Sequence, residues 1–516
     1  MTTSIHSPIE RRALDHSVTT LSAVLLLLTI ALAVWNQVLL LDYLEWGDES
    51  ETIVASKMLA AGMALYSQVF NHHGPLTFLP GYALERFGSF GVREHRVVVA
   101  ALQAVALGSL YVSPLLRGRL SRQLMLPITI TAIVIFMPLS NLWGHTYIYQ
   151  VLAGLLLVVV LAQYTLPSLI DPASLTRAGV ILGSVGIASL PWLAITYLPA
   201  AALLFICSLR RSFLQPALLA ALGAAAANLA FLGLIGSYKG YLAFHIYLNS
   251  QILPAYNSGH GPIQMAGRAF GALTGFYGTI DVWIAFVGLA AVFAGLLADR
   301  SGRLSWRPVF FGVALLTLLA RGMTHHGAPF WYACIALGTV SLVRLDLARP
   351  QRALWLVVAC CCVLRLAYPI FVDNRSYTMG ARKEVTEFGQ LARQLTNPND
   401  KVIAWSFQNF EYLAADRLPA SGHFFYLPWQ QKYNDAPKLG IVIDACHDIA
   451  EHKPKVMLID KWVVWNRHPW ESYSECVQSI IDRDYRQIPG HPIYVRSELF
   501  DQAMQLIQKE PRPATR

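Results

Sequence analysis

The sequence predicts a polytopic α-helical membrane protein with a soluble α/β domain at its C-terminus. Of its 516 residues, 55% are hydrophobic and only 14% are charged, whereas roughly a quarter of the residues of a soluble globular protein are charged. Apolar stretches long enough to cross a bilayer, or nearly so, recur as far as residue 371. From about Asp373 the chain becomes charged and polar. We therefore expect a membrane domain over residues 1–372 and a separate domain over residues 373–516.

The apolar stretches predict about eleven membrane-spanning helices. They lie around residues 20–41, 97–116, 123–140, 147–166, 178–208, 213–236, 280–298, 308–320, 329–343 and 352–371. The 178–208 stretch counts as two short helices, because Pro191 and Pro199 interrupt it. The 20–41 stretch follows two arginines, as in a signal peptide, but it is too long for a usual signal sequence and lacks a small-residue cleavage site. We interpret it as a retained first span.

The arginines predict the orientation of the chain. Its net charge of +9 would suggest a nucleic-acid partner in a soluble protein. Here the basic residues gather in short loops between alternate spans, namely Arg117, Arg119, Arg122, Arg177, Arg210, Arg211, Arg300, Arg303, Arg307, Arg344, Arg349 and Arg352. Because cytoplasmic loops collect Lys and Arg, we expect a cytoplasmic N-terminus and no nucleic-acid partner. The odd number of spans then leaves the C-terminal domain outside.

The first outside loop, residues 42–96, carries a dense group of acids directly after the first span. These acids are Asp42, Glu45, Asp48, Glu49 and Glu51. Acids close to a span are costly and indicate a functional site by default. The competing interpretation is the N-terminus of a helix from Glu51 to Ala61, where acidic side chains favour the helix dipole and cap the helix.

The remainder of this loop has the pattern of a structured segment. Ala60–Gly88 predicts an amphipathic helix, a turn containing His72 and His73, and a second apolar helix. Long structured loops tend to be functional. The alternative for the two histidines is ordinary polar packing.

Cationic residues in the outside segments predict a phosphate-binding site. A phosphate needs Arg or Lys for charge and paired hydrogen bonds, and protonated His assists. The short loop Ala320–Phe330 provides Arg321, His325 and His326, for which anchoring to lipid headgroups is the alternative. Further candidates on the same face are scattered: Lys239, His245, His260 and Arg268.

The C-terminal domain has an α/β pattern. Lys401–Ser406 and Lys455–Asp460 predict buried strands, and Ile441–Glu451 predicts a helix that leads into the second strand. In an oxidising compartment Cys446 and Cys476 would be able to pair. Their spacing does not decide between a disulfide and two free thiols.

The outside segments carry short motifs in a characteristic order. An Asp-Glu pair, Asp48 and Glu49, directly follows the first span. The chain thereby resembles the GT-C superfamily of membrane glycosyltransferases, specifically the branch of family 39 that includes protein mannosyltransferases and the lipid A aminoarabinose transferase. Further features similar to this branch are Ala60–Gly62, Gly74–Pro75, Phe87–Gly88, Arg96, the late loop with Arg321, His325 and Pro329, and the segment Glu411–Ser421. Where the aminoarabinose branch has a lysine before Pro-Pro to meet the donor phosphate, this chain has Asn71, His72 and His73.

The resemblance implies a GT-C-like fold and an inverting transfer of a sugar from a polyprenyl-phosphate donor. It assigns the catalytic base to Asp48 and an orienting role to Glu49. Donor phosphate contacts are expected from Arg321, His325, His326, His72, His73 and Lys239. No cofactor and no metal ligands are predicted, because acids and histidines at this spacing do not define a metal site. A divalent cation bound by the acids is nevertheless compatible with the sequence.

The expected setting is the bacterial inner membrane, with the transfer on the periplasmic side. The expected partners are the donor, membrane lipids, and a glycan, lipid or protein acceptor. Two other functions remain open from the sequence. One is a transporter or flippase for lipid-linked sugars, and the other is a non-catalytic partner in the assembly of envelope glycans.

Overall fold

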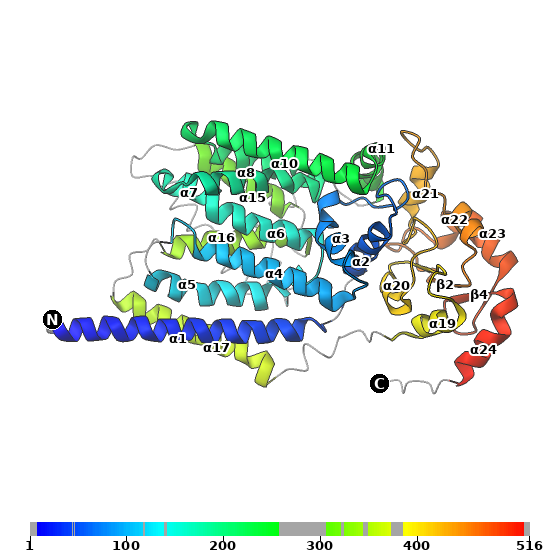
Figure 1. The fold of residues 1–516 in the computed structure, drawn as a ribbon, viewed down its shortest axis with the longest axis horizontal. Coiled ribbons are helices and arrows are strands. Elements are labelled where there is room, and N and C mark those ends of the chain that lie inside the picture. Colours follow the sequence, from blue (N-terminus) through cyan, green and yellow to red (C-terminus); the bar gives the residue numbers. More distant parts are fainter. Residues whose placement is uncertain are drawn as a thin grey trace. The chain divides into compact units, whose positions relative to one another are not determined.

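The computed structural model describes residues 8–43, 45, 47–116, 119–138, 142–256, 306–320, 325–343, 349–372 and 385–509. The chain divides into two compact units (Figure 1). The first comprises Met1–Leu44, Arg96–Ala226 and Gly261–Ala381, and the second comprises Glu45–His95, Ala227–His260 and Arg382–Arg516. Most of the first outside loop is thus in the same unit as the C-terminal residues, whereas the sequence analysis placed it with the membrane domain. The expected boundary near Asp373 lies outside the described residues.

The first unit is helical. Its long helices are α1 (Pro8–Leu40), α4 (Val92–Tyr111, which begins in the second unit), α5 (Arg119–Thr131), α6 (Tyr149–Val160), α8 (Arg177–Ser189), α9 (Leu198–Ser208), α10 (Leu214–Ile235, which continues into the second unit), α15 (Trp306–Leu319), α16 (Ala328–Val343) and α17 (Arg349–Phe371). Short π-helical segments, Ala132–Phe136 and Leu161–Thr165, extend α5 and α6, and α7 (Leu166–Ile170) follows the second of them.

Helices of the first unit pack through small residues and a few buried polar pairs. Figure 1 shows α1, α5 and α17 side by side, and these three pack against one another. On α6, a Cβ added to Gly154 would lie 2.1 Å from the ring of Tyr332 on α16, so only glycine fits at this crossing. The hydroxyls of Thr129 and Thr339 are hydrogen-bonded at 2.6 Å between α5 and α16. Such pairs satisfy polar groups away from water.

The lengths of the described helices agree with a multi-pass membrane protein. Three of them are long and apolar enough to cross a bilayer, His16–Leu40, Tyr149–Ile170 and Arg211–Ile235, and shorter apolar helices cover Arg122–Phe136, Ile195–Ser208, Trp306–Leu319 and Leu354–Tyr368. The division of the 178–208 stretch into two helices is confirmed. Between α8 and α9 the chain makes short 3-10 turns, one of which contains Pro191. The span expected at 280–298 lies outside the described residues.

The second unit combines three segments of the chain. From its first two segments come α2 (Gly47–Ala60), the 3-10 turn Pro75–Thr77, α3 (Leu79–Glu85), α11 (Tyr238–Gly240), the π-helix Tyr241–Ile252 and α12 (Leu253–Tyr256). Lys57 forms a salt bridge of 3.1 Å with Glu85, which connects α2 to α3. The C-terminal segment contributes the helices α19 (Glu387–Leu395), α20 (Phe410–Ala415), α21 (Pro428–Asn434), α22 (Ala445–His452), α23 (Glu475–Asp484) and α24 (Phe500–Lys509).

A four-stranded mixed sheet forms the core of the C-terminal segment. Its strands are β1 (Ile403–Trp405), β2 (Val456–Ile459), β3 (Tyr485–Gln487) and β4 (Ile493–Arg496), in the order β1-β2-β4-β3. β1 pairs with β2 in parallel, with Ala404 opposite Leu458, and the other two pairings are antiparallel. Every residue of β1 and β2 is buried, so both predicted strands are confirmed.

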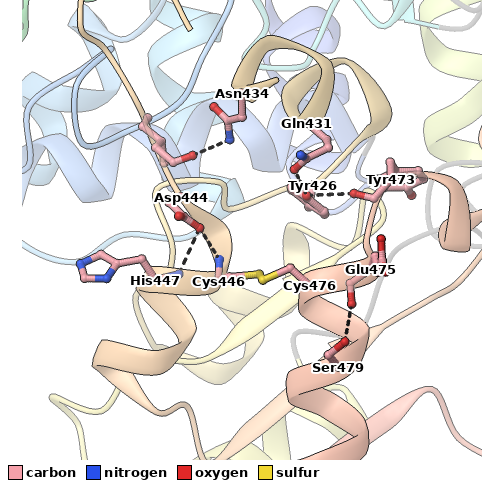
Figure 2. The surroundings of a disulfide bond; sticks show 11 residues. Tyr426, Gln431, Asn434, Asp444, Cys446, His447, Tyr473, Glu475, Cys476 and Ser479 are labelled. Carbon is pink, nitrogen blue, oxygen red and sulfur yellow. Dashed lines mark hydrogen bonds between the residues drawn. A yellow bond between two sulfur atoms is a disulfide. The ribbon is translucent and has the colours of Figure 1, made fainter. Parts of the chain in front are cut away.

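The Cys446–Cys476 disulfide, which the sequence left open, is present in the structure and joins α22 to α23 (Figure 2). α22 begins later than the predicted Ile441, because Asp444 caps it by accepting hydrogen bonds from the backbone N–H groups of Cys446 and His447 at 2.9 and 3.1 Å. The two cysteines therefore extend from the beginnings of neighbouring helices.

The expectation for Ala60–Gly88 needs correction. α2 already begins at Gly47 and ends at Ala60, and no amphipathic helix follows it before the histidine turn. The chain instead reverses at Gly62 and Tyr66, which have φ values of 93° and 66°. Left-handed backbone ends a helix. The second predicted helix is present as α3.

Candidate functional site

Arg96 holds the end of the first span. It is one of the residues that resemble the glycosyltransferase branch, and in this structure it has a structural role. Its Nη1 donates to the backbone carbonyls of Leu40, Leu41 and Tyr43 at 3.0, 3.2 and 2.7 Å. The side chain is 2% exposed. A buried cation at a helix C-terminus pairs with carbonyls that have no partner within the helix. Arg96 thereby fixes the end of α1, from which the acidic loop departs.

The acids of the loop differ in their accessibility. Asp48 and Glu49 are both in the first turn of α2. Glu49 is fully buried, whereas Asp48 is partly exposed. Glu45 accepts a hydrogen bond from the backbone N–H of Ser50 at 3.2 Å, so it contributes to the capping of α2. Of the two acids in this turn, Asp48 is the more accessible to solvent.

Glu51 lies one turn further along α2 and contacts the histidine turn. Its Oε1 accepts a hydrogen bond of 2.9 Å from Nδ2 of Asn71 and lies 3.6 Å from Nδ1 of His73. Burial raises the pKa of Glu51 well above its ordinary value, and the nearby charge of Asp48 adds to the shift. The hydrogen bond from Asn71 acts in the opposite direction.

Side chains from neighbouring elements hold the backbone of the histidine turn. The carbonyl of His72 accepts hydrogen bonds from Nδ1 of His245 and Nδ2 of Asn249, at 2.9 and 2.7 Å. Because a carbonyl only accepts, Nδ1 of His245 carries the proton. The carbonyl of His73 accepts from the hydroxyl of Tyr66 at 2.5 Å. His245 is thus placed as a support of the turn.

Three potential metal ligands meet at this point. Glu51, His72 and His73 each offer one ligand atom, and these atoms all lie within 4.8 Å of one another. The rings of His72 and His73 are tilted against each other with centroids 4.2 Å apart. The sequence alone predicted no contact between Glu51 and the histidines. A usable signal was the separation of three residues between Asp48 and Glu51, which places both acids on one helix face.

The histidine turn is anchored to the C-terminal segment through Phe70. The backbone N–H of Phe70 donates to the carbonyl of Gly422 at 3.0 Å. Its ring packs against Phe244, His423 and Phe425, with centroids 4.9, 5.1 and 5.7 Å away. Burial lowers the pKa of His423 to about 4. These residues carry no motif, and the sequence analysis did not identify them.

The remaining predicted phosphate contacts are distributed over the chain. Lys239 is exposed on α11 in the second unit. His325 and His326 lie in a 3-10 turn of the first unit with ring centroids 4.1 Å apart, and Nδ1 of His326 lies 3.2 Å from Nε2 of Gln150. Three other candidates are outside the described residues: Arg321, His260 and Arg268.

No protein-family model matches the sequence, and no curated protein matches it. Several solved structures match the fold of this chain. ArnT from Cupriavidus metallidurans bound to undecaprenyl phosphate matches with a TM-score of 0.56 and 12% identity over 91% of this chain and 97% of that chain. Its apo state matches with a TM-score of 0.50 and 12% identity over 85% and 94% of the two chains. An Archaeoglobus fulgidus oligosaccharyltransferase matches with a TM-score of 0.43 and 14% identity, over 85% of this chain and 67% of that chain.

ArnT is a GT-C enzyme, and its similarity to this chain extends over nearly the full length of both proteins. The chain is a multi-pass membrane protein with the fold of a GT-C glycosyltransferase.

Proposed function

We propose that the protein transfers a sugar from a polyprenyl-phosphate donor to an acceptor hydroxyl. The observation that supports this most directly is the position of Asp48. It is a partly exposed carboxylate in the first turn after the first span, in a chain with the fold of an enzyme crystallised with undecaprenyl phosphate. The acceptor is proposed to be a glycan, a lipid or a protein.

In the proposed reaction Asp48 is the general base. The acceptor hydroxyl oxygen attacks the anomeric carbon of the donor sugar, and its proton passes to the carboxylate of Asp48. The bond between the anomeric carbon and the phosphate oxygen breaks, and its electron pair leaves with the polyprenyl phosphate. Attack from the opposite side inverts the anomeric configuration. One carboxylate suffices, because the phosphate leaves without a strong general acid.

Glu49 has a supporting role in this proposal. Its carboxyl is fully buried in the first turn of α2, beside Asp48 in sequence. A buried group is poorly placed to meet an incoming hydroxyl directly. We assign to Glu49 the orientation of Asp48 and, through it, of the acceptor.

Cationic and histidine side chains are proposed to stabilise the charge that gathers on the departing phosphate. Arg321 is the principal candidate, since guanidinium binds phosphate through two parallel hydrogen bonds. The assisting candidates are His72, His73, His325, His326 and Lys239. The transfer step is proposed to need no redox or organic cofactor.

The proposed location of the reaction is the periplasmic side of the bacterial inner membrane. The Cys446–Cys476 disulfide supports this side for the α/β segment, because disulfides persist in oxidising compartments. The arginines in alternate short loops support a cytoplasmic N-terminus. On this proposal residues 373–516 form a periplasmic domain.

The test is release of polyprenyl phosphate from a labelled polyprenyl-phosphate sugar by the purified protein in proteoliposomes. We expect Asp48→Asn to slow release by a factor of about 10² to 10⁴, the usual contribution of a general base. Glu49→Gln should slow it less. Wild-type turnover by the Asp48→Asn variant would refute the assignment of the base. If the wild-type protein instead moves the intact donor across the bilayer without cleaving it, the protein is a transporter and not a transferase.

A further inference from the structure

We propose that Glu51, His72 and His73 form a binding site for a divalent transition-metal cation, with Zn²⁺ as the preferred ion. The site lies next to the acids to which the transfer reaction is assigned. Cation binding itself does not depend on that reaction, and only its consequence for the donor rests on the proposed function.

The distances suit three ligands of one ion. Bonds from Zn²⁺ to imidazole nitrogen or carboxylate oxygen are about 2.1 Å, so two ligand atoms of a tetrahedral site are roughly 3.4 Å apart. Nδ1 of His73 and Oε1 of Glu51 are 3.6 Å apart. This is longer than the usual N–H···O hydrogen bond of about 2.9 Å. The three ligand atoms all lie within 4.8 Å of one another, so small side-chain rotations complete the geometry.

The chemistry of the ligands selects the metal. Two imidazoles and one carboxylate form a common zinc set in which three protein ligands leave a position for water or a substrate. Magnesium and calcium prefer oxygen ligands throughout. His72 is partly exposed, whereas Glu51 and His73 are 2% and 8% exposed. The open position is therefore expected on the side of His72.

Hydrogen bonds to each ligand residue hold the set in place before any ion binds. Asn71 bonds to Glu51 through Nδ2 and to the backbone N–H of His73 through Oδ1, at 2.9 and 2.8 Å. The carbonyls of His72 and His73 accept hydrogen bonds from His245, Asn249 and Tyr66. Supporting contacts of this kind orient metal ligands and increase metal affinity.

The charges around Glu51 also favour a cation. The carboxyl is buried, and Asp48 lies one turn away on the same helix. Across the described part of the chain, no lysine or arginine forms a salt bridge with Glu51. His73, whose Nδ1 is 3.6 Å from Oε1 of Glu51, balances the carboxylate only when its ring is protonated, and an uncompensated buried carboxylate is costly. A bound divalent ion would compensate its charge.

If the proposed function holds, a phosphate oxygen of the donor is the natural ligand for the open position. His72 and His73 would then act on the phosphate through the ion.

The experiment measures metal binding by the full-length protein, purified without a histidine tag and freed of metal with a chelator. Zn²⁺ alone is titrated by calorimetry, and Co²⁺ alone is titrated while its visible absorption is followed. We expect one equivalent of Zn²⁺, and Co²⁺ bands typical of four or five ligands. Glu51→Gln and the double variant His72→Ala/His73→Ala should weaken Zn²⁺ binding at least 100-fold. His447→Ala, which removes a histidine that is 72% exposed, should leave it unchanged.

The inference is overturned if the wild-type protein binds no stoichiometric Zn²⁺, or if Glu51→Gln binds it as His447→Ala does. If the double variant fails to fold, the Glu51→Gln variant and the Co²⁺ spectrum of the wild type test the site instead. Glu51→Gln is expected to fold, because the glutamine side chain keeps an oxygen that accepts the hydrogen bond from Asn71. Sugar transfer is scored separately with Asp48→Asn. Zinc binding without turnover of the donor would refute the proposed function but not the metal site. Turnover of the donor without zinc binding would refute the metal site but not the proposed function.

Discussion

The side chain of Asn71 donates a hydrogen bond of 2.9 Å to Oε1 of Glu51 while its own Oδ1 accepts the backbone N–H of His73. One fully buried amide thus connects the acidic helix to the histidine turn. The contact with Glu51 joins residues 20 positions apart in sequence, so the position of the turn against α2 depends on Asn71.

Asn71→Ala should therefore affect the site more than the fold. We expect it to lower the free energy of unfolding by about 1 to 3 kcal/mol, because Glu51 loses a buried hydrogen bond. Metal affinity should fall roughly 10- to 100-fold, as for the loss of other supporting contacts. Calorimetric titration with Zn²⁺ and denaturant unfolding measure the two effects. Asn399→Ala, at an exposed position, is the matched control, and equal effects of both variants would contradict the role given to Asn71.

Gly422→Ala should disrupt the anchor of the histidine turn. A Cβ at Gly422 would lie 2.2 Å from the backbone carbonyl of Gln68, so the two backbones must separate. We expect a loss of about 2 kcal/mol or more in the free energy of unfolding, with slower sugar transfer. Gly223→Ala in α10 meets nothing within 4 Å and should be neutral or stabilising by up to about 1 kcal/mol. A neutral Gly422→Ala in thermal unfolding would show that this contact is not tight.

His423 should make the second unit sensitive to acid. Burial holds its pKa at about 4, against an ordinary value of 6.5. Between these values the unfolded chain binds a proton that the folded chain does not, so stability falls as the pH is lowered from 6.5 to 4. The full effect is roughly 3 kcal/mol.

The comparison is with His423→Gln, whose amide is able to donate to the carbonyl of Ile443, as the ring nitrogen of His423 does at 2.8 Å. The free energy of unfolding is measured for both proteins from pH 4 to 7. Because other groups titrate equally in both, the wild-type value should decline relative to the variant as the pH falls. Parallel curves would exclude a neutral buried histidine.

Removal of the disulfide should destabilise the C-terminal segment. Cys446 and Cys476 are 30 residues apart in sequence, and closing a loop of that size is worth about 3 to 4 kcal/mol in the chain-entropy model. We expect the variant with both cysteines changed to alanine to unfold at a lower temperature than the oxidised wild type. Reductant should lower the unfolding temperature of the wild type and leave that of the variant unchanged. Equal unfolding temperatures of wild type and variant without reductant would show that the bond adds nothing.

Several features encoded by local pattern were predicted correctly from the sequence. Hydrophobic runs predicted the helices of the first unit, and the prolines predicted the break between α8 and α9. Short apolar runs predicted the strands β1 and β2. The acids after the first span are conspicuous in the sequence because of their charge, and their role in a site stays a prediction. Each of these patterns depends on a few neighbouring residues.

Features that depend on long-range packing were missed. Glu51 and His73 are brought together by a reversal of the chain at Tyr66, a residue whose left-handed backbone no propensity predicts. The first outside loop joins the C-terminal residues through Phe70 and Gly422, far apart in sequence. Hydrophobic patterns indicate that such residues are buried but do not identify their partners.

The π-helix Tyr241–Ile252 makes this region sensitive to changes in chain length. Each of its hydrogen bonds spans one residue more than in an α-helix, and on this wider helix His245 and Asn249 both reach the carbonyl of His72. Deleting one residue here would rotate the side chains that follow by the angle of one residue, about 100° in an α-helix. Proteins that share the fold should therefore vary here by substitution and seldom by insertion or deletion.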